Sequence, residues 1–99
     1  MPSNEQPAHH RQRRAVRPHL AMRPLWLCRV CAAAWPCAPA RLLLAMEYRA
    51  DRVALSAYMA GQLFEATADL CRLNPDPAPD PRELFARFLA WTARPPTEP

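Results

Sequence analysis

Three cysteines and a histidine occupy one short stretch of this 99-residue chain. Cys28 and Cys31 form a Cys-x-x-Cys pair, Cys37 follows six residues after the pair, and His19 precedes it by nine. Thiolate and imidazole are the ligands of tetrahedral structural zinc, and two cysteines with two residues between them can bind one ion from a tight turn. The stretch therefore predicts a zinc site with ligands His19, Cys28, Cys31 and Cys37.

The fourth ligand is the open part of this prediction. His19 is preferred because it lies nearest to the cysteine pair, while Cys71, His9 and His10 are the alternatives. Cys71 is also expected on an apolar helix stripe, where it would serve as a small buried hydrophobe. Ala32 follows the pair at a position where many zinc knuckles carry glycine, which counts slightly against the turn.

The same thiols would suit two other chemistries. An iron–sulfur cluster is the alternative to zinc, and it would take His19 or Cys71 as its remaining ligand. A thiol–disulfide switch at Cys28 and Cys31 is the second, but the alternating strands and helices of a thioredoxin-like fold are missing from the sequence. Outside this stretch no serine, histidine and carboxylate pattern predicts nucleophilic catalysis.

The size of the chain explains why a metal would be needed. Roughly 80 residues are suited to folding, and a helical domain of that size buries too little apolar surface to dispense with a metal, a disulfide or a partner. Arg29 and Pro36 interrupt the apolar run that could have served as a signal sequence. No segment approaches the ~20 apolar residues that span a bilayer. We therefore expect a cytoplasmic protein without membrane contact.

Positive charge is concentrated at the N-terminus. Residues 1–30 contain six arginines and one glutamate, in a chain whose net charge is +4. Residues 1–18 have no hydrophobic periodicity, so we predict a disordered basic arm there. An arginine-rich arm can bind nucleic acid through phosphate contacts, although this one has no aromatic side chain to stack on bases.

Signals for the start of a helix occur three times after the cysteines, at Pro39, at Asp51 and at the Asp80-Pro81 pair. Proline fits the first helical position and aspartate caps the free backbone N–H groups before it. Alternate prolines before the last signal favour an extended connector, and no strand-like alternation is present. We predict helices at residues 39–49, 52–71 and 81–93, with the connector at 72–80.

The second predicted helix is apolar on two sides. One stripe consists of Leu55, Met59, Leu63, Ala66 and Leu70, the other of Val53, Ala57, Ala60, Phe64, Ala68 and Cys71, and the remaining face carries Tyr58, Gln62, Glu65 and Asp69. Two apolar stripes require two neighbours. This helix is therefore expected at the centre, between the other two helices or against a second protomer, with its polar face in solvent.

These elements predict an all-α fold in four parts. They are a disordered basic arm at 1–18, a metal-binding knuckle at 19–38, a three-helix domain at 39–94 and a disordered tail at 95–99. The expected function is that of a small zinc-binding interaction or regulatory module rather than an enzyme. A protein partner or a second copy of the chain is its expected partner, with nucleic acid as a further candidate for the arm.

Two known families share parts of this pattern. The spacing Cys28-x2-Cys31-x5-Cys37 resembles the last three cluster ligands of WhiB-like iron–sulfur regulators over those ten residues alone. From about His19 to Arg94 the chain resembles small, largely uncharacterised actinobacterial proteins with a Trp-Pro-Cys motif, here Trp35-Pro36-Cys37. That resemblance also covers Arg41 and the final Leu84-Phe85-x-Arg87-Phe88-Leu89-x-Trp91-Thr92.

Members of the actinobacterial group are often automatically labelled flavin reductase. The resemblance therefore implies a flavin or thiol oxidoreductase as the enzymatic alternative. A flavin is not expected from the residues themselves, because the sequence contains neither a glycine-rich phosphate loop nor a βαβ unit.

Overall fold

In a computed structural model of the protein, residues 18–93 are described. All but the last residue of the predicted arm, and the predicted tail at 95–99, lie outside this part of the chain. The elements within it are the strands β1 (Ala21–Met22) and β2 (Leu27–Cys28), the helices α2 (Ala38–Glu47), α3 (Arg52–Leu73) and α4 (Pro81–Phe88), and the 3-10 helix η2 (Ala90–Ala93).

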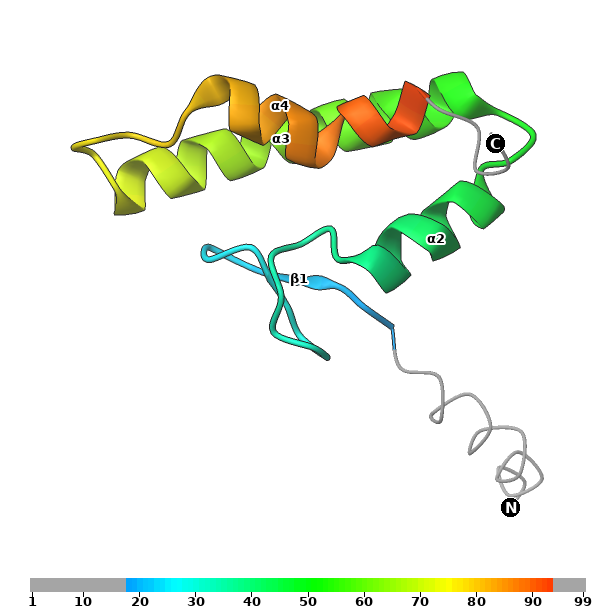
Figure 1. The fold of residues 1–99 in the computed structure, drawn as a ribbon, viewed down its shortest axis with the longest axis horizontal. Helices are drawn as coiled ribbons and strands as arrows, with labels where there is room; N and C mark the ends of the chain where they lie inside the picture. Colours follow the sequence, from blue (N-terminus) through cyan, green and yellow to red (C-terminus); the bar gives the residue numbers. More distant parts are fainter. Residues whose placement is uncertain (1–17, 94–99) are drawn as a thin grey trace, which may run out of the picture.

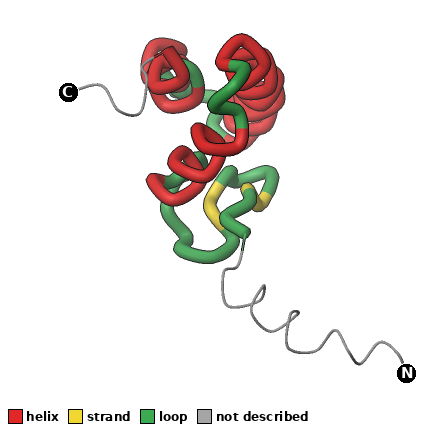
Figure 2. The backbone as a smooth tube through the Cα atoms, turned by 90° about the vertical axis from the view of Figure 1, so that its right-hand side faces the viewer, coloured by secondary structure: helices red, strands yellow, loops and turns green. Residues whose placement is uncertain are grey.

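The longest helix, α3, is the element on which the others are arranged. The α4 helix runs back along α3, and η2 continues in the direction of α4. Together α4 and η2 lie antiparallel to α3 (Figure 1). The α2 helix leads into α3 through a short turn and diverges from it. Seen from the side, α2 and the strands lie on the same side of the α3 and α4 pair (Figure 2).

The predicted caps at Asp51 and Asp80 are confirmed, whereas α2 begins at Ala38, one residue before the predicted start at Pro39. The Asp51 carboxylate accepts a hydrogen bond from the Ala54 amide at 3.0 Å, and that of Asp80 accepts one from the Arg82 amide at 2.9 Å. Each bond satisfies a backbone donor that has no partner within its helix. The predicted third helix is divided in the structure, because α4 ends at Phe88 and η2 follows. None of the helices within residues 18–93 is long and apolar enough to cross a membrane.

The prediction of an all-α fold is wrong in one respect. Strands β1 and β2 pair antiparallel, with Ala21 opposite Cys28 and Met22 opposite Leu27. A single bridge adds Ala34 on the other side of Leu27. Strands of two residues are too short to show the alternation of side chains from which a strand is predicted. The predicted knuckle is therefore a small hairpin followed by a turn.

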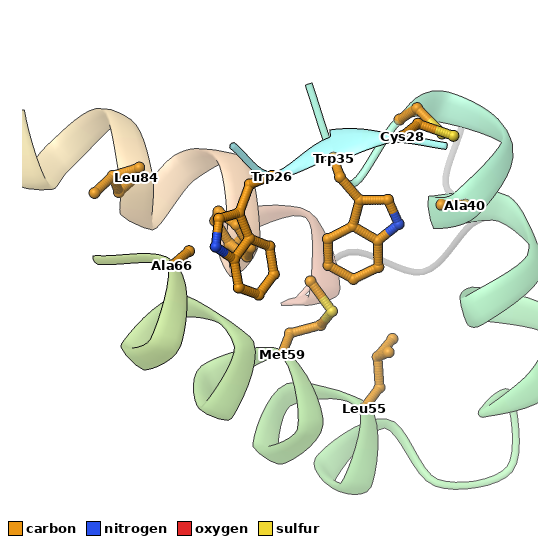
Figure 3. Close-up of a cluster of buried hydrophobic side chains, with 10 residues drawn as sticks. Trp26, Cys28, Trp35, Ala40, Leu55, Met59, Ala66 and Leu84 are labelled. Atoms are coloured by element: carbon orange, nitrogen blue, oxygen red, sulfur yellow. The ribbon is translucent and has the colours of Figure 1, made fainter. Parts of the chain in front are cut away.

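The core lies between this hairpin segment and the helices. Trp26 and Trp35 reach from it toward Leu55 and Met59 of α3 (Figure 3). Both indoles also contact the buried Phe88 of α4, with ring centroids 5.6 and 6.1 Å from it. Aromatic rings at these separations add to the stabilisation from burial alone. The tryptophans thus join the hairpin to both α3 and α4.

Only one of the two apolar stripes of α3 has neighbours. Leu55, Met59 and Ala66 of the first stripe are buried. On the second stripe Val53 is 79% and Phe64 77% exposed. Our expectation of two neighbours is therefore not met within the described residues, because α2, α4 and the hairpin all pack on the side of the first stripe.

The polar face of α3 was predicted to lie in solvent, and for Asp69 this is wrong. Asp69 is only 5% exposed. Its Oδ2 accepts hydrogen bonds from Arg23 Nε at 2.8 Å and Trp26 Nε1 at 2.9 Å. Arg23 also pairs with the half-exposed carboxylate of Glu65, one turn earlier on α3. The tip of the hairpin docks on this face, which no pattern within the helix reveals.

A second polar anchor comes from α4. The guanidinium of Arg87 donates to the carbonyl oxygens of Trp35 and Trp26, at 2.8 Å each. A charged donor to a partly buried carbonyl contributes about 1.5–3 kcal/mol. Arg87 and Asp69 thus secure the same segment from two different helices.

We expect Asp69→Asn to lower the melting temperature at pH 7. Hydrogen bonds from Arg23 and then Trp26 hold the pKa of Asp69 below its usual value. The stabilisation is complete above the unfolded-state pKa of about 3.9 and is lost as the pH falls through the lower folded-state pKa. The difference in melting temperature between wild type and variant should therefore close below about pH 4, as measured by circular dichroism.

Glu65→Gln is the matched control for this experiment. Its carboxylate also pairs with Arg23, but it is half exposed, and exposed ion pairs contribute little to stability. Its effect should be smaller than that of Asp69→Asn at pH 7. Equal losses would show that Asp69 is not a buried anchor.

Candidate metal centre

The structure brings together all four side chains that the sequence singled out. One ligand atom from each of His19, Cys28, Cys31 and Cys37 can be chosen so that all lie within 4.8 Å of one another. His19 Nδ1 is 3.2 Å from Cys28 Sγ and 3.5 Å from Cys37 Sγ. These four residues form a Cys3His group that could hold a metal ion.

The turn after β2 sets the spacing of the first two thiols. The Cys28 amide donates to Ala33 O at 2.7 Å, and the Ala32 amide donates back to Cys28 O at 2.9 Å. The Val30 amide points at Cys28 Sγ, 3.3 Å away. Backbone amides directed at a cysteine sulfur stabilise its thiolate. The turn thus prepares the pair for an ion even though glycine is absent.

The backbone strain of this turn is located at Ala32. Its φ angle is 63°, in the left-handed region that glycine adopts without strain. The substitution of alanine for the usual glycine therefore does not prevent the knuckle, contrary to the objection raised by the sequence. It does place a β-carbon where the backbone conformation disfavours one.

The other two ligands are held by longer-range contacts. Trp35 Nε1 donates to the His19 carbonyl at 2.9 Å, which fixes the segment just before β1 that carries the histidine. Cys37 is the N-cap residue of α2. Arg41, one turn into α2, donates to the Pro36 carbonyl at 3.1 Å. The group therefore joins the hairpin to the beginning of α2.

The four side chains differ in their exposure. Cys28 and Cys37 are buried, His19 is partly buried and Cys31 is exposed. A metal bound here would be covered by protein on the side of the core and would reach the surface at Cys31. Cys71 is not part of the group, although it was the main alternative to His19 as ligand. His9 and His10 lie outside the described residues.

The two buried thiols differ in proton affinity. Burial raises the pKa of Cys28, but the amides of Cys31 and Val30, followed by the thiols of Cys31 and Cys37, offset this and lower it to about 6. For Cys37, burial raises the pKa to about 11, with Cys28 and Cys31 adding to the effect. Without a metal, Cys28 therefore favours the thiolate at neutral pH and Cys37 favours the thiol.

The raised pKa of Cys37 is unexpected for a thiol at the start of a helix. The free N–H groups there favour a thiolate, and the Ala40 amide does act in that direction. Burial and the neighbouring thiols outweigh this amide. A divalent ion would reverse the balance, because coordination deprotonates a thiol outright.

An apolar groove adjoins the site. It has a volume of about 900 Å³, and Cys37 lies in its wall. Most of the wall is alanine, proline and leucine, with Arg41, Arg52 and Trp91 as its larger members. Nothing in the sequence pattern indicated this groove, because its walls come from four separate segments.

Sequence reasoning also missed the residues that hold the site in place. Arg23, Asp69 and Arg87 fix the hairpin to the helices, yet none of them was predicted to have a role. Arg87 belonged to the C-terminal part of the actinobacterial resemblance, which was the one available signal. Asp69 had none, since its partners lie 43 and 46 residues away in the chain.

Comparison with known proteins gave no relative for this chain. No protein-family model matches it, and no match was found among curated proteins or solved structures. The resemblance to actinobacterial Trp-Pro-Cys proteins therefore stays a prediction.

We expect Ala32→Gly to stabilise the folded protein by about 0.5–1 kcal/mol. Relief of the left-handed conformation is worth about 1–2 kcal/mol, and the greater freedom of glycine in the unfolded chain takes back about 0.4–1 kcal/mol. Ala33→Gly is the control. Among the described residues only Trp26 and Ala32 have positive φ angles, so Ala33→Gly should only destabilise. Denaturant unfolding of both variants gives the comparison, and equal losses would contradict the account of Ala32.

Proposed function

We propose that the chain is a small zinc-binding interaction module in which the metal has a structural role. The observation that supports this best is the convergence of three thiols and one imidazole within 4.8 Å. These side chains come from the segment before β1, the end of β2, the turn after it and the start of α2. Structural zinc sites have this ligand set and commonly use a Cys-x-x-Cys knuckle.

The short separations favour a single ion over an iron–sulfur cluster. Around a tetrahedral zinc, with bonds of about 2.0–2.3 Å, neighbouring ligand atoms lie roughly 3.4–3.8 Å apart. The separations of 3.2 and 3.5 Å from His19 Nδ1 are close to this range. A cluster of several irons and sulfides lies between its cysteine ligands and spreads them farther apart. Zinc therefore requires the smaller rearrangement.

A structural role for the ion follows from the number and place of the ligands. Four protein ligands complete a tetrahedral shell and leave no open position for a substrate. The chain segments that carry the ligands also carry Trp26 and Trp35, whose side chains fill the core. A metal that fixes Cys28 and Cys37 thereby fixes the two indoles. In a domain with so small a core, this linkage would contribute much of the stability.

The proposed role as an interaction or regulatory module rests on exposed apolar surface. Leu42, Leu43 and Met46 on α2 and Phe64 on α3 are all exposed. Exposed apolar side chains gathered on one face of a helix mark interaction sites in proteins. Binding of nucleic acid by the arginine-rich arm would involve residues outside the described part. A flavin or thiol oxidoreductase remains the enzymatic alternative, and the groove beside Cys37 is where a ligand would have to bind.

Metal analysis of the purified full chain tests the proposal. We expect about one zinc per chain, as for a single four-ligand site. Cys28→Ser and His19→Ala should each lose zinc and lower the melting temperature, whereas His19→Cys should retain zinc because a thiolate can replace the imidazole. Elemental analysis and thermal unfolding, with and without a chelator, provide the measurements.

Cys71→Ser is the matched control, since Cys71 lies outside the group. It should leave zinc content and melting temperature unchanged. Stoichiometric iron with visible absorbance would indicate an iron–sulfur cluster in place of zinc. A flavin absorption spectrum would favour the oxidoreductase. A melting temperature that does not respond to the chelator would overturn the structural role.

A further inference from the structure

The side of α3 that faces away from the core has no charged residue. On a helical wheel this outer face lies opposite Leu55 and Met59. It consists of Val53, Ala57, Ala60, Gly61, Phe64, Thr67, Ala68 and Cys71. The solvent side of a helix normally carries charged and polar residues. A helix that is apolar on opposite sides requires a second partner.

The outer face is exposed to solvent and is not flat. Val53 and Phe64 are both more than three quarters exposed, and no part of residues 18–93 covers them. A β-carbon added to Gly61 would meet no atom within 4 Å. Beside Phe64 a hollow of about 410 Å³ is lined by Ala60, Leu63, Thr67 and Ala68. A protruding ring thus stands next to a shallow, apolar recess.

Large and small residues on this face are complementary when two copies of the helix run antiparallel. When two copies of α3 are placed antiparallel about a point between Ala60 and Gly61, Phe64 of each copy opposes Ala57 of the other. In the same register Val53 opposes Ala68. Each large side chain therefore meets a small one, and the helices can approach closely at the centre. A second copy of the chain is therefore complementary to this face.

From this pattern we propose that the outer face of α3 is a homodimer interface, in which two copies pack α3 against α3 in antiparallel orientation about Ala60 and Gly61. The inference deepens the proposed interaction role by naming a second copy of the chain as the partner. It rests on that role only in requiring the folded chain, since none of the four ligand residues lies on the outer face.

The dimensions suit a modest interface. A helix of 22 residues is about 33 Å long, and a specific interface needs about 1,000 Å² of buried surface in total. The two Phe64 rings supply a large share, because a buried aromatic side chain contributes about 150–250 Å². Antiparallel helices also bring opposite ends of their dipoles together. The symmetric, isologous arrangement closes at two copies.

The oligomeric state of the metal-loaded full chain tests the proposal. Sedimentation at protein concentrations up to about 100 µM should show a reversible dimer. Phe64→Glu should raise the dissociation constant at least tenfold, because it would place two carboxylates in the apolar interface. The control is Phe85→Glu, since Phe85 is 53% exposed on α4 and outside the outer face. This control should leave the dimer intact.

Two results would overturn the interface. They are a wild-type chain that is monomeric throughout the range, and a Phe64→Glu variant that dimerises as well as wild type. Circular dichroism and zinc content are measured on every sample, so loss of folding or of metal is distinguished from loss of association. A monomer with normal zinc would contradict the dimer alone, and a dimer without zinc would contradict the metal proposal alone.

The register has a separate test, in which the Phe64→Glu and Ala57→Lys variants are mixed. In the proposed register the introduced glutamate of one copy would lie opposite the introduced lysine of the other. We expect the mixture to form more dimer than either variant alone, because the mixed pair joins glutamate to lysine at one end and keeps phenylalanine against alanine at the other. No gain in the mixture would overturn the antiparallel register.

Discussion

The seating of the hairpin on the helices is the interaction on which the structure depends. Trp26 and Trp35 enter the space between α3 and α4, and Asp69 and Arg87 fix the backbone that carries them. Neither part has a sufficient core without the other, because the helices bury few large side chains apart from those that touch the indoles. Burial of two tryptophans and an edge-to-face contact with Phe88 therefore supply the cohesion of the domain.

This seating links the metal site to the core through covalent neighbours. Trp26 lies two residues before Cys28, and Trp35 two residues before Cys37. One residue separates the members of each pair. Both buried thiols thus belong to segments whose positions are set by the core, and an ion at the four ligands would hold the indoles in place in return. Metal affinity and folding free energy would then be parts of one quantity.

What could be predicted from the sequence was local. The caps at Asp51 and Asp80 and the cluster of His19 with three cysteines rest on residues close in the chain, and the structure contains them. The roles of Asp69 and Arg87 depend on partners more than forty residues away, and a helical wheel cannot distinguish a polar residue in solvent from one beneath a docked hairpin. The left-handed turn at Ala32 was missed for a different reason, since conformational strain there is outweighed by the surrounding contacts.

The Cys3His group and the outer face of α3 both relate to the small core of this domain. A chain of this size can bury only a limited apolar area, and its longest helix has a core on one side alone. A bound metal would add cohesion from within by joining segments that share little surface, whereas a second copy would add it from outside by covering the unpaired face. The two proposed contributions lie on opposite sides of α3 and would stabilise the core from both. The 22-residue helix α3 would then contact the metal-linked core on one side and the second copy on the other.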